Sequence, residues 1–187
     1  SLQEQKEFYL PGVFWRDVLE KLGRYYIEFG IEEFRNSNTN VYFFAPNYGA
    51  PTNGFSEEKV IEIQSLISER LNFKQFNVIK NSLSGYTQAL SDYRVFNAAN
   101  TINDKLDLTN FSESTIGKPK ECFEFDGKRF SRSSLNYLLG LSFLKKNIAD
   151  FAPKTILEIG GGFGTLGEII GKSNLKNFKY INLDLPP

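Results

Sequence analysis

The residues best suited to bind a ligand lie near the end of the 187-residue chain, in the segment ILEIGGGFGTLGEII. Four glycines, Gly160, Gly161, Gly162 and Gly164, directly follow a short apolar run. Glycine has no Cβ, so its backbone adopts positive φ readily and lets a ligand approach the main chain. A tight turn with close packing would explain one or two of these glycines, but not all four. The segment therefore predicts a ligand-binding loop between a strand and a helix.

Two cofactor patterns compete for this loop. Gly162, Gly164 and Gly167 match the dinucleotide pattern GxGxxG, but that match begins beyond the end of the apolar run. The pattern that begins at the run itself is Glu-x-Gly-x-Gly-x-Gly, from Glu158 to Gly164. The spacing thus draws attention to Glu158, an acidic residue at the mouth of the loop.

The charge of Glu158 favours one cofactor over the other. NAD and FAD place a pyrophosphate at the N-terminus of the helix that follows such a loop. A carboxylate at ~4 Å from that anion would be repelled by about 4 kcal/mol at an effective dielectric constant of about 20. S-adenosylmethionine has no phosphate, and it carries a positive ammonium and a positive sulfonium. We therefore expect Glu158 to attract S-adenosylmethionine and to repel a dinucleotide.

A second acidic residue, Asp184, lies 20 residues after Gly164. An acidic residue at about this distance reaches the ribose hydroxyls of a bound nucleoside. Both cofactor classes use such a residue, so Asp184 supports nucleoside binding without choosing between them. An aspartate at a strand end also commonly serves as a cap or turn residue.

The elements that must position the loop form a β-α-β unit. KTILEI lacks polar alternation and predicts a buried parallel strand, a short helix begins at about Gly164, and FKYINLDL predicts a second strand. Upstream, the hairpin pair Asp126-Gly127 lies between phenylalanines, and a helix is expected from about Ser133 to Asn147. The apolar repeat of that helix is Leu135, Leu138, Leu139 and Leu144.

The first part of the chain predicts helices joined by irregular segments. Apolar residues recur at helical spacing from Phe14 to Tyr26, and one or two further helices fill residues 73–100 with a break at Gly85. Ser56 is the expected cap of another helix. The residues expected on the buried side of that helix are Val60, Ile61, Ile63, Leu66, Ile67 and Leu71.

Composition restricts the possible functions. Lys and Arg together number 22, as do Asp and Glu, so no overall charge attracts nucleic acid or an anionic membrane. The longest nearly apolar stretch, from Tyr137 to Leu144, is too short to cross a bilayer. The single Cys122 cannot form an intrachain disulfide, and no His is present to activate it as a nucleophile. We expect a soluble, cytoplasmic protein without membrane insertion.

The loop and its surroundings resemble a known group of enzymes. TILEIGGGFGTLGEIIG resembles motif I of class I S-adenosylmethionine-dependent methyltransferases. The run from IGKPKECFEFDGKRFSRSSLNYLLGLSFL to YINLDLPP resembles the bacterial sugar O-methyltransferase family. The resemblance covers about residues 116–187 well and the earlier part only loosely.

The resemblance implies methyl transfer to a sugar hydroxyl in polysaccharide or glycan synthesis. By analogy, Glu158 and the loop glycines would hold the methionyl part of the cofactor, and Asp184 would hold the ribose. Tyr137 would lie on the helix that packs over the methionyl end, although core packing is the other interpretation of this residue. No catalytic residue and no metal site can be assigned from the sequence.

The predicted fold class is α/β, in three parts. Residues 1–115 form a mainly helical N-terminal region, and residues 116–150 form a hairpin and helix that lead into the core. Residues 151–187 form the first β-α-β unit of a Rossmann-like methyltransferase sheet. Two parallel strands do not make a stable sheet alone, so we expect the chain to be an N-terminal piece of a longer enzyme.

Other functions remain open. A Rossmann loop also fits an NAD(P)-dependent oxidoreductase or epimerase, and a helical interaction module with a degenerate nucleotide fold would be non-catalytic. The segment VYFFAPNYGAPTNGF offers aromatic residues for stacking on a sugar and asparagines for its hydroxyls, although such aromatics more often pack beneath a long loop. These residues are Tyr42, Phe43, Phe44 and Tyr48, with Asn47 and Asn53.

Overall fold

The computed structural model of the chain describes residues 12–36, 48–49, 57–100, 106–119 and 121–184. The expected cap Ser56 and the residues Tyr42, Phe43, Phe44, Asn47 and Asn53 lie outside the described residues. The described helices are α2 (Val13–Phe29), η1 (Ile31–Glu33, a 3-10 turn), α4 (Glu57–Ser68), α5 (Phe73–Leu83), α6 (Tyr86–Asn100), α7 (Arg132–Asn147) and α8 (Thr165–Gly171). The strands are β1 (Phe123–Phe125), β2 (Lys128–Phe130), β3 (Thr155–Ile159) and β4 (Lys179–Leu183).

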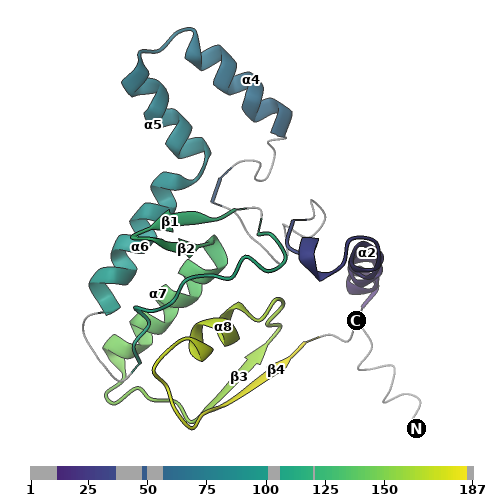
Figure 1. Ribbon diagram of the computed structural model, residues 1–187, viewed down its shortest axis with the longest axis vertical. Coiled ribbons are helices and arrows are strands. Elements are labelled where there is room, and N and C mark those ends of the chain that lie inside the picture. Colours follow the sequence, from purple (N-terminus) through teal and green to yellow (C-terminus); the bar gives the residue numbers. More distant parts are fainter. Residues whose placement is uncertain (1–11, 37–47, 50–56, 101–105, 120, 185–187) are drawn as a thin grey trace.

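The predicted α/β class is confirmed. Helices come first along the chain, followed by an antiparallel β1–β2 hairpin, α7, and a parallel pair of strands β3 and β4 joined through α8 (Figure 1). In the parallel pair Ile156 lies opposite Tyr180, and Glu158 lies opposite Asn182. The strand, helix and strand expected around the glycine loop are therefore present in that order.

The core lies where α6, α7, α8 and the β1–β2 hairpin meet (Figure 1). Aromatic rings fill much of it. Tyr93 of α6 stacks on Phe125 with ring centroids 4.8 Å apart and contacts Phe130 at 5.1 Å. The largest fully buried aliphatic side chains are Leu106 and Leu108 of the segment before the hairpin, Leu135 and Leu138 of α7, and Ile169 and Ile170 of α8. The core thus fixes α7 and α8, the helices on either side of the glycine loop in the sequence.

A capping box defines the start of α7. The Ser131 hydroxyl accepts from the Ser134 amide at 3.3 Å, and the Ser134 hydroxyl accepts from the Ser131 amide at 2.9 Å. The hairpin turn directly upstream is the one predicted, because Asp126 and Gly127 have φ of 50° and 72°. Leu144 is the exception to the expected apolar face, since it is exposed near the end of the helix.

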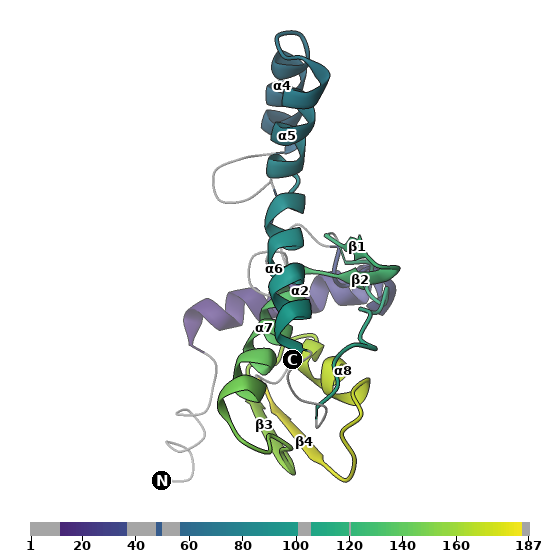
Figure 2. The ribbon, with the colours of Figure 1, turned by 90° about the vertical axis from the view of Figure 1, so that its left-hand side faces the viewer.

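Helices α4 and α5 form a hairpin that projects from the rest of the molecule (Figures 1 and 2). The predicted break at Gly85 separates α5 from α6, with φ of 77°, and a Cβ there would lie 2.5 Å from the Cβ of Tyr48. The expectation for the buried side of α4 is partly wrong. Val60 is buried, but Ile61 and Leu66 are exposed, because two packed helices cover only one side of each other.

The two faces of the β3–β4 sheet differ in their cover. Tyr137 of α7 and Gly167 of α8 contact the face that carries Glu158 and Tyr180. The opposite face is open, with Leu157, Ile159 and Leu183 all exposed. The prediction that KTILEI forms a buried parallel strand is therefore right for the parallel pairing and wrong for burial, since only one face is covered.

Helix α2 packs against η1 and buries the side chain of Leu22. Gly30 ends α2 with φ of 70°, which turns the chain into η1. The Tyr25 hydroxyl donates to the Glu33 carbonyl at 3.3 Å, and Tyr26 meets Phe34 edge-on at 5.7 Å. This arrangement places residues 34–36 beside the central part of the molecule.

Candidate functional site

The glycine loop lies at the carboxyl end of β3, where it turns into α8. The Gly160 amide donates to the Leu183 carbonyl at 2.7 Å and thereby extends the parallel pairing by one bond. The Gly164 amide donates to the Gly161 carbonyl at 2.9 Å, which closes the turn before α8. Gly160, Gly162 and Gly164 have φ of 72°, 50° and 74°. Three of the four predicted glycines thus adopt the backbone conformation that favours glycine.

Open space distinguishes the loop glycines from one another. A Cβ built on Gly160 or on Gly164 would meet no atom within 4 Å. A Cβ on Gly161 would lie 2.6 Å from Oδ1 of Asn182 and 2.7 Å from Oε2 of Glu158. Gly161 is therefore required by the packing of the strand ends, whereas Gly160 and Gly164 leave the main chain accessible.

Glu158 is buried on the covered face of the sheet, with both oxygens in hydrogen bonds. The Tyr137 hydroxyl donates to its Oε1 at 2.7 Å, and the Tyr180 hydroxyl donates to its Oε2. The carboxylate is thus held between α7 and β4. A carboxylate oxygen accepts more than one hydrogen bond, so these two donors do not exhaust its capacity.

Both tyrosines that bind Glu158 are held in their protonated form. Burial, and then the hydrogen bond to Glu158, raises the pKa of Tyr137 to about 12. The same causes raise the pKa of Tyr180 further above its usual value. At neutral pH both phenols therefore keep the proton that they donate to the carboxylate.

Asp184, at the end of β4, contacts the loop directly. Its Oδ2 accepts from the Gly162 amide at 2.7 Å, and the residue is exposed. The two predicted acidic residues consequently lie on the two sides of the same loop, one buried and one at the surface. The structure brings together Glu158, Gly160, Gly161, Gly162, Gly164, Asp184 and Tyr137, the full set of predicted site residues.

The N-terminal region also reaches the loop. Phe163, between Gly162 and Gly164, meets the ring of Phe34 edge-on at 5.1 Å. The guanidinium of Arg35 lies over the same Phe163 ring, with its Cζ 5.5 Å from the ring centroid. The loop is thus in contact with a segment more than a hundred residues earlier in the chain.

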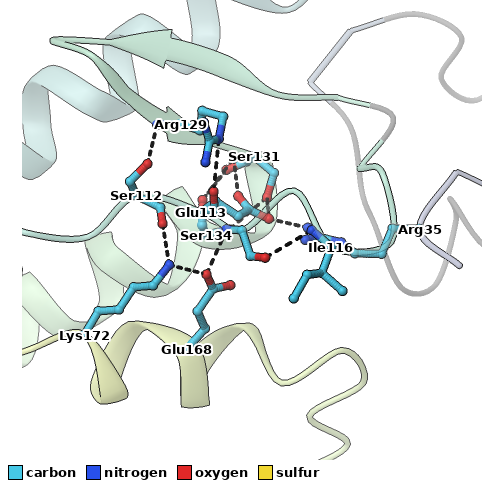
Figure 3. A network of polar contacts seen from close by, with 10 residues as sticks. Arg35, Ser112, Glu113, Ile116, Arg129, Ser131, Ser134, Glu168 and Lys172 are labelled. Atoms are coloured by element: carbon cyan, nitrogen blue, oxygen red, sulfur yellow. Dashed lines mark hydrogen bonds and ion pairs between the residues drawn. The ribbon is translucent and has the colours of Figure 1, made fainter. Parts of the chain in front are cut away.

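Arg35 belongs to a buried polar network at the start of α7 (Figure 3). Its side chain forms an ion pair with Glu113, and both side chains are buried. Glu113 also accepts from the Ser131 amide at 2.6 Å and from the Ser131 hydroxyl at 3.0 Å. The Arg35 amide donates to the Gly117 carbonyl at 2.7 Å. The network therefore joins the N-terminal segment to the cap of α7.

Sequence reasoning missed Tyr180, Arg35 and Glu113. Tyr180 and Asn182 alternate along β4, so the period of a strand places them on the face that Glu158 shares. That signal was present in the sequence. The pairing of Arg35 with Glu113 joins residues 78 positions apart, and no local pattern indicates it.

Other features singled out in the sequence contribute less to a site. Tyr48 is half-buried, packs against the core and has its hydroxyl bonded to Asp92, which favours the packing interpretation of this aromatic. Burial raises the pKa of the Cys122 thiol, which disfavours the reactive thiolate. Within the described ranges, no cluster of His, Cys, Asp or Glu is arranged to hold a metal ion. In the same ranges, no helix is long and apolar enough to cross a membrane.

Comparison of the chain with models of protein families, with curated proteins and with solved structures gave no match.

Proposed function

We propose that the chain carries the cofactor-binding part of an S-adenosylmethionine-dependent methyltransferase that methylates a sugar hydroxyl. The observation that carries the proposal is the loop between β3 and α8. Gly160 and Gly164 have positive φ and open space beside the main chain, and the carboxylates of Glu158 and Asp184 flank them. Such a loop at the carboxyl ends of parallel strands is a site where a nucleoside cofactor binds.

The charges at the loop favour a cationic ligand. Glu158 and Asp184 contribute two carboxylates, whereas Arg35, the cation that lies over Phe163, is paired with the buried carboxylate of Glu113. A pyrophosphate at the start of α8 would be repelled by the two carboxylates. The charge of Arg35 would not offset this repulsion, because it is already paired with Glu113. This balance supports S-adenosylmethionine over NAD or FAD.

The residues present fit the cofactor in distinct roles. Asp184 is exposed at the strand end, where a carboxylate can accept from ribose hydroxyls. Glu158 would attract the methionyl ammonium. The hydrogen bonds from Tyr137 and Tyr180 would hold the Glu158 carboxylate in place. The cofactor would supply an electrophilic methyl carbon, to which the sugar oxygen would bond in line as the carbon–sulfur bond breaks and S-adenosylhomocysteine leaves, while a base takes the hydroxyl proton. We assign no catalytic base.

The acceptor and the location belong to the same proposal. The sugar hydroxyl and its role in polysaccharide or glycan synthesis depend on the resemblance of residues 116–187 to the sugar O-methyltransferase family. A cytoplasmic location fits a chain with a single cysteine. No nucleic-acid partner is proposed, because positive and negative residues balance.

Calorimetry of the full-length protein with S-adenosylhomocysteine and with NAD tests the cofactor class. S-adenosylhomocysteine keeps the adenosine and the methionyl ammonium, so we expect it to bind, and NAD to bind weakly or not at all. Glu158→Gln should weaken the binding of S-adenosylhomocysteine. Glu124→Gln makes the same substitution at an exposed residue of β1 and is its control for nonspecific charge effects. Binding of NAD without binding of S-adenosylhomocysteine would overturn the proposal in favour of an oxidoreductase or epimerase.

A further inference from the structure

We propose that Arg35 is a positioning residue for the glycine loop, acting through Phe163 on one side and through Glu113 on the other. The inference builds on the proposed function, because it names a residue that shapes the same cofactor loop. Arg35 lies outside the β-α-β unit and is separated from Phe163 by more than a hundred residues. It would couple the N-terminal region to the site.

The first contact is with the loop itself. The Cζ of Arg35 lies 5.5 Å from the centroid of the Phe163 ring, within the range of a cation–π interaction. Phe34 holds the same ring edge-on at 5.1 Å. Phe163 is flanked by Gly162 and Gly164, which have no side chains that could anchor the loop. Through the Phe163 ring, Phe34 and Arg35 can therefore restrain the glycine-rich backbone of the loop.

The second contact fixes the guanidinium. Glu113 is fully buried and pairs with Arg35, while its carboxylate also accepts two bonds from Ser131 at the start of α7 (Figure 3). Two turns further along, α7 presents Tyr137, whose hydroxyl donates to Glu158. One ion pair therefore connects Arg35 with the helix that holds the buried acid of the site.

A third connection leads to α8. The Ser114 amide, next to Glu113 in sequence, donates to Oε1 of Glu168 at 2.8 Å. Lys172, the residue directly after α8, donates to the Ser112 carbonyl at 2.6 Å (Figure 3). The segment that carries Glu113 is consequently tied to the helix that begins where the glycine loop ends. Arg35 meets the loop directly and both adjoining helices indirectly.

The guanidinium of Arg35 is held by the ion pair with Glu113 and by the ring of Phe163, while its amide donates to the Gly117 carbonyl. Its Nε is buried without a hydrogen-bond partner among the described residues. A buried donor left unpaired is unfavourable, so other interactions must hold the guanidinium where it is. The ion pair with Glu113 and the face of Phe163 are the two interactions that do so.

Hydrogen exchange in the absence of ligand tests the proposal. Arg35→Lys keeps the positive charge but loses the planar guanidinium, and Phe163→Leu removes the ring without touching Glu113. We expect each to raise the exchange rates of the Gly162 and Gly164 amides by about threefold to tenfold, the range of one cation–π contact. Amides in the centre of α6 exchange when the whole protein unfolds, so their rates should not change if the substitutions act on the loop alone.

A double variant and a matched control complete the experiment. The effects of Arg35→Lys and Phe163→Leu should be less than additive in the double variant, because the two substitutions share the contact between Arg35 and Phe163. Each also affects one further contact, Arg35 with Glu113 and Phe163 with Phe34. Lys118→Met breaks the exposed ion pair with Glu33 on the same segment and should leave the loop amides unchanged. Unchanged loop exchange in both single variants, or independent effects in the double variant, would overturn the proposal.

Cofactor affinity separates this proposal from the proposed function. S-adenosylhomocysteine should bind the Arg35→Lys and Phe163→Leu proteins more weakly by a factor similar to the rise in loop exchange. If the unchanged protein binds no S-adenosylhomocysteine, the methyltransferase proposal fails, while the exchange rates still decide whether Arg35 positions the loop.

Discussion

The two faces of the β3–β4 sheet differ at the carboxyl end of β3, where the covered face buries a carboxylate and the open face exposes an isoleucine. Glu158 is 7% exposed and points toward α7, whereas the next residue along the same strand, Ile159, is 79% exposed. Tyr180 and Leu183 repeat this contrast on β4. A sheet stabilised only by hydrophobic burial would place the leucines and isoleucines against the helices.

The covered face carries residues of the candidate site, whereas the open face carries exposed apolar side chains. On the covered face, a buried carboxylate is stable because Tyr137 and Tyr180 donate to it. On the open face, Leu157 and Ile159 gain little from burial in this chain. Substitutions on the covered face should therefore change the chemistry of the loop, and substitutions on the open face should hardly matter for folding.

The largest effect should come from Gly162→Val at the loop. A β-branched residue is strained at φ of 50°, and its side chain would occupy space beside the main chain. Strain of about 1–3 kcal/mol that disfavours the binding conformation corresponds to a loss of S-adenosylhomocysteine affinity of about fivefold to 150-fold. Calorimetry measures the affinity, and circular dichroism should show the helices intact. Affinity within twofold of the unchanged protein would remove the loop from the site.

Glu158→Gln should have the next largest effect. The substitution keeps the shape of the side chain but removes the charge that would attract the methionyl ammonium. We expect S-adenosylhomocysteine binding to weaken by about 1–3 kcal/mol, the usual cost of losing a charged hydrogen-bond partner. Glu124→Gln on the exposed hairpin strand is the control and should leave the affinity unchanged. Equal affinity in the Glu158→Gln protein would contradict the charge argument.

Much of the fold was accessible from the sequence because its signals are local. The helix break at Gly85, the turn at Asp126-Gly127 and the order of strand, loop and helix around Gly160 follow from single residues or short patterns. Which side chains are buried was harder to predict from the sequence. Ile61 and Leu66 have helical spacing but lie on a projecting hairpin, and spacing alone does not reveal whether a neighbour is present.

The candidate site could be predicted from the sequence to a similar extent. Glu158 and Asp184 could be placed beside the loop because parallel strands end at the same edge of a sheet. That Glu158 faces α7, and that Tyr137 bonds to it, depends on how a helix packs against the sheet. The contact of Arg35 with Phe163 depends on the tertiary fold alone, since no sequence period links residues so far apart.

Tyr137→Phe should lower the free energy of unfolding at neutral pH, because the buried Glu158 carboxylate loses a donor, and it should also change how that free energy depends on alkaline pH. The folded protein holds the pKa of Tyr137 at about 12, above its ordinary value of 10.0, so the folded state keeps a proton that the unfolded state loses. The free energy of unfolding should therefore fall as the pH rises from about 10 to about 12. Removing the hydroxyl should make this fall less steep. Denaturant unfolding across that pH range measures it, and an unchanged slope would contradict the assignment.

Ile159→Thr should have the smallest effect. Ile159 lies on the open face and is 79% exposed, and threonine keeps the β-branched shape that suits a strand. We expect the free energy of unfolding to change by less than about 0.5 kcal/mol. The matched substitution Ile156→Thr lies on the same strand with its side chain packed against the core, so it should destabilise the protein by more than Ile159→Thr does.

Denaturant unfolding of the two variants at several protein concentrations makes this comparison decisive. If the open face is exposed in solution, the result for Ile159→Thr is small and independent of concentration. A loss larger than that of Ile156→Thr would contradict the difference between the two faces. It would mean that another surface buries Ile159 in solution, because an exposed side chain cannot lose burial energy that it never gained.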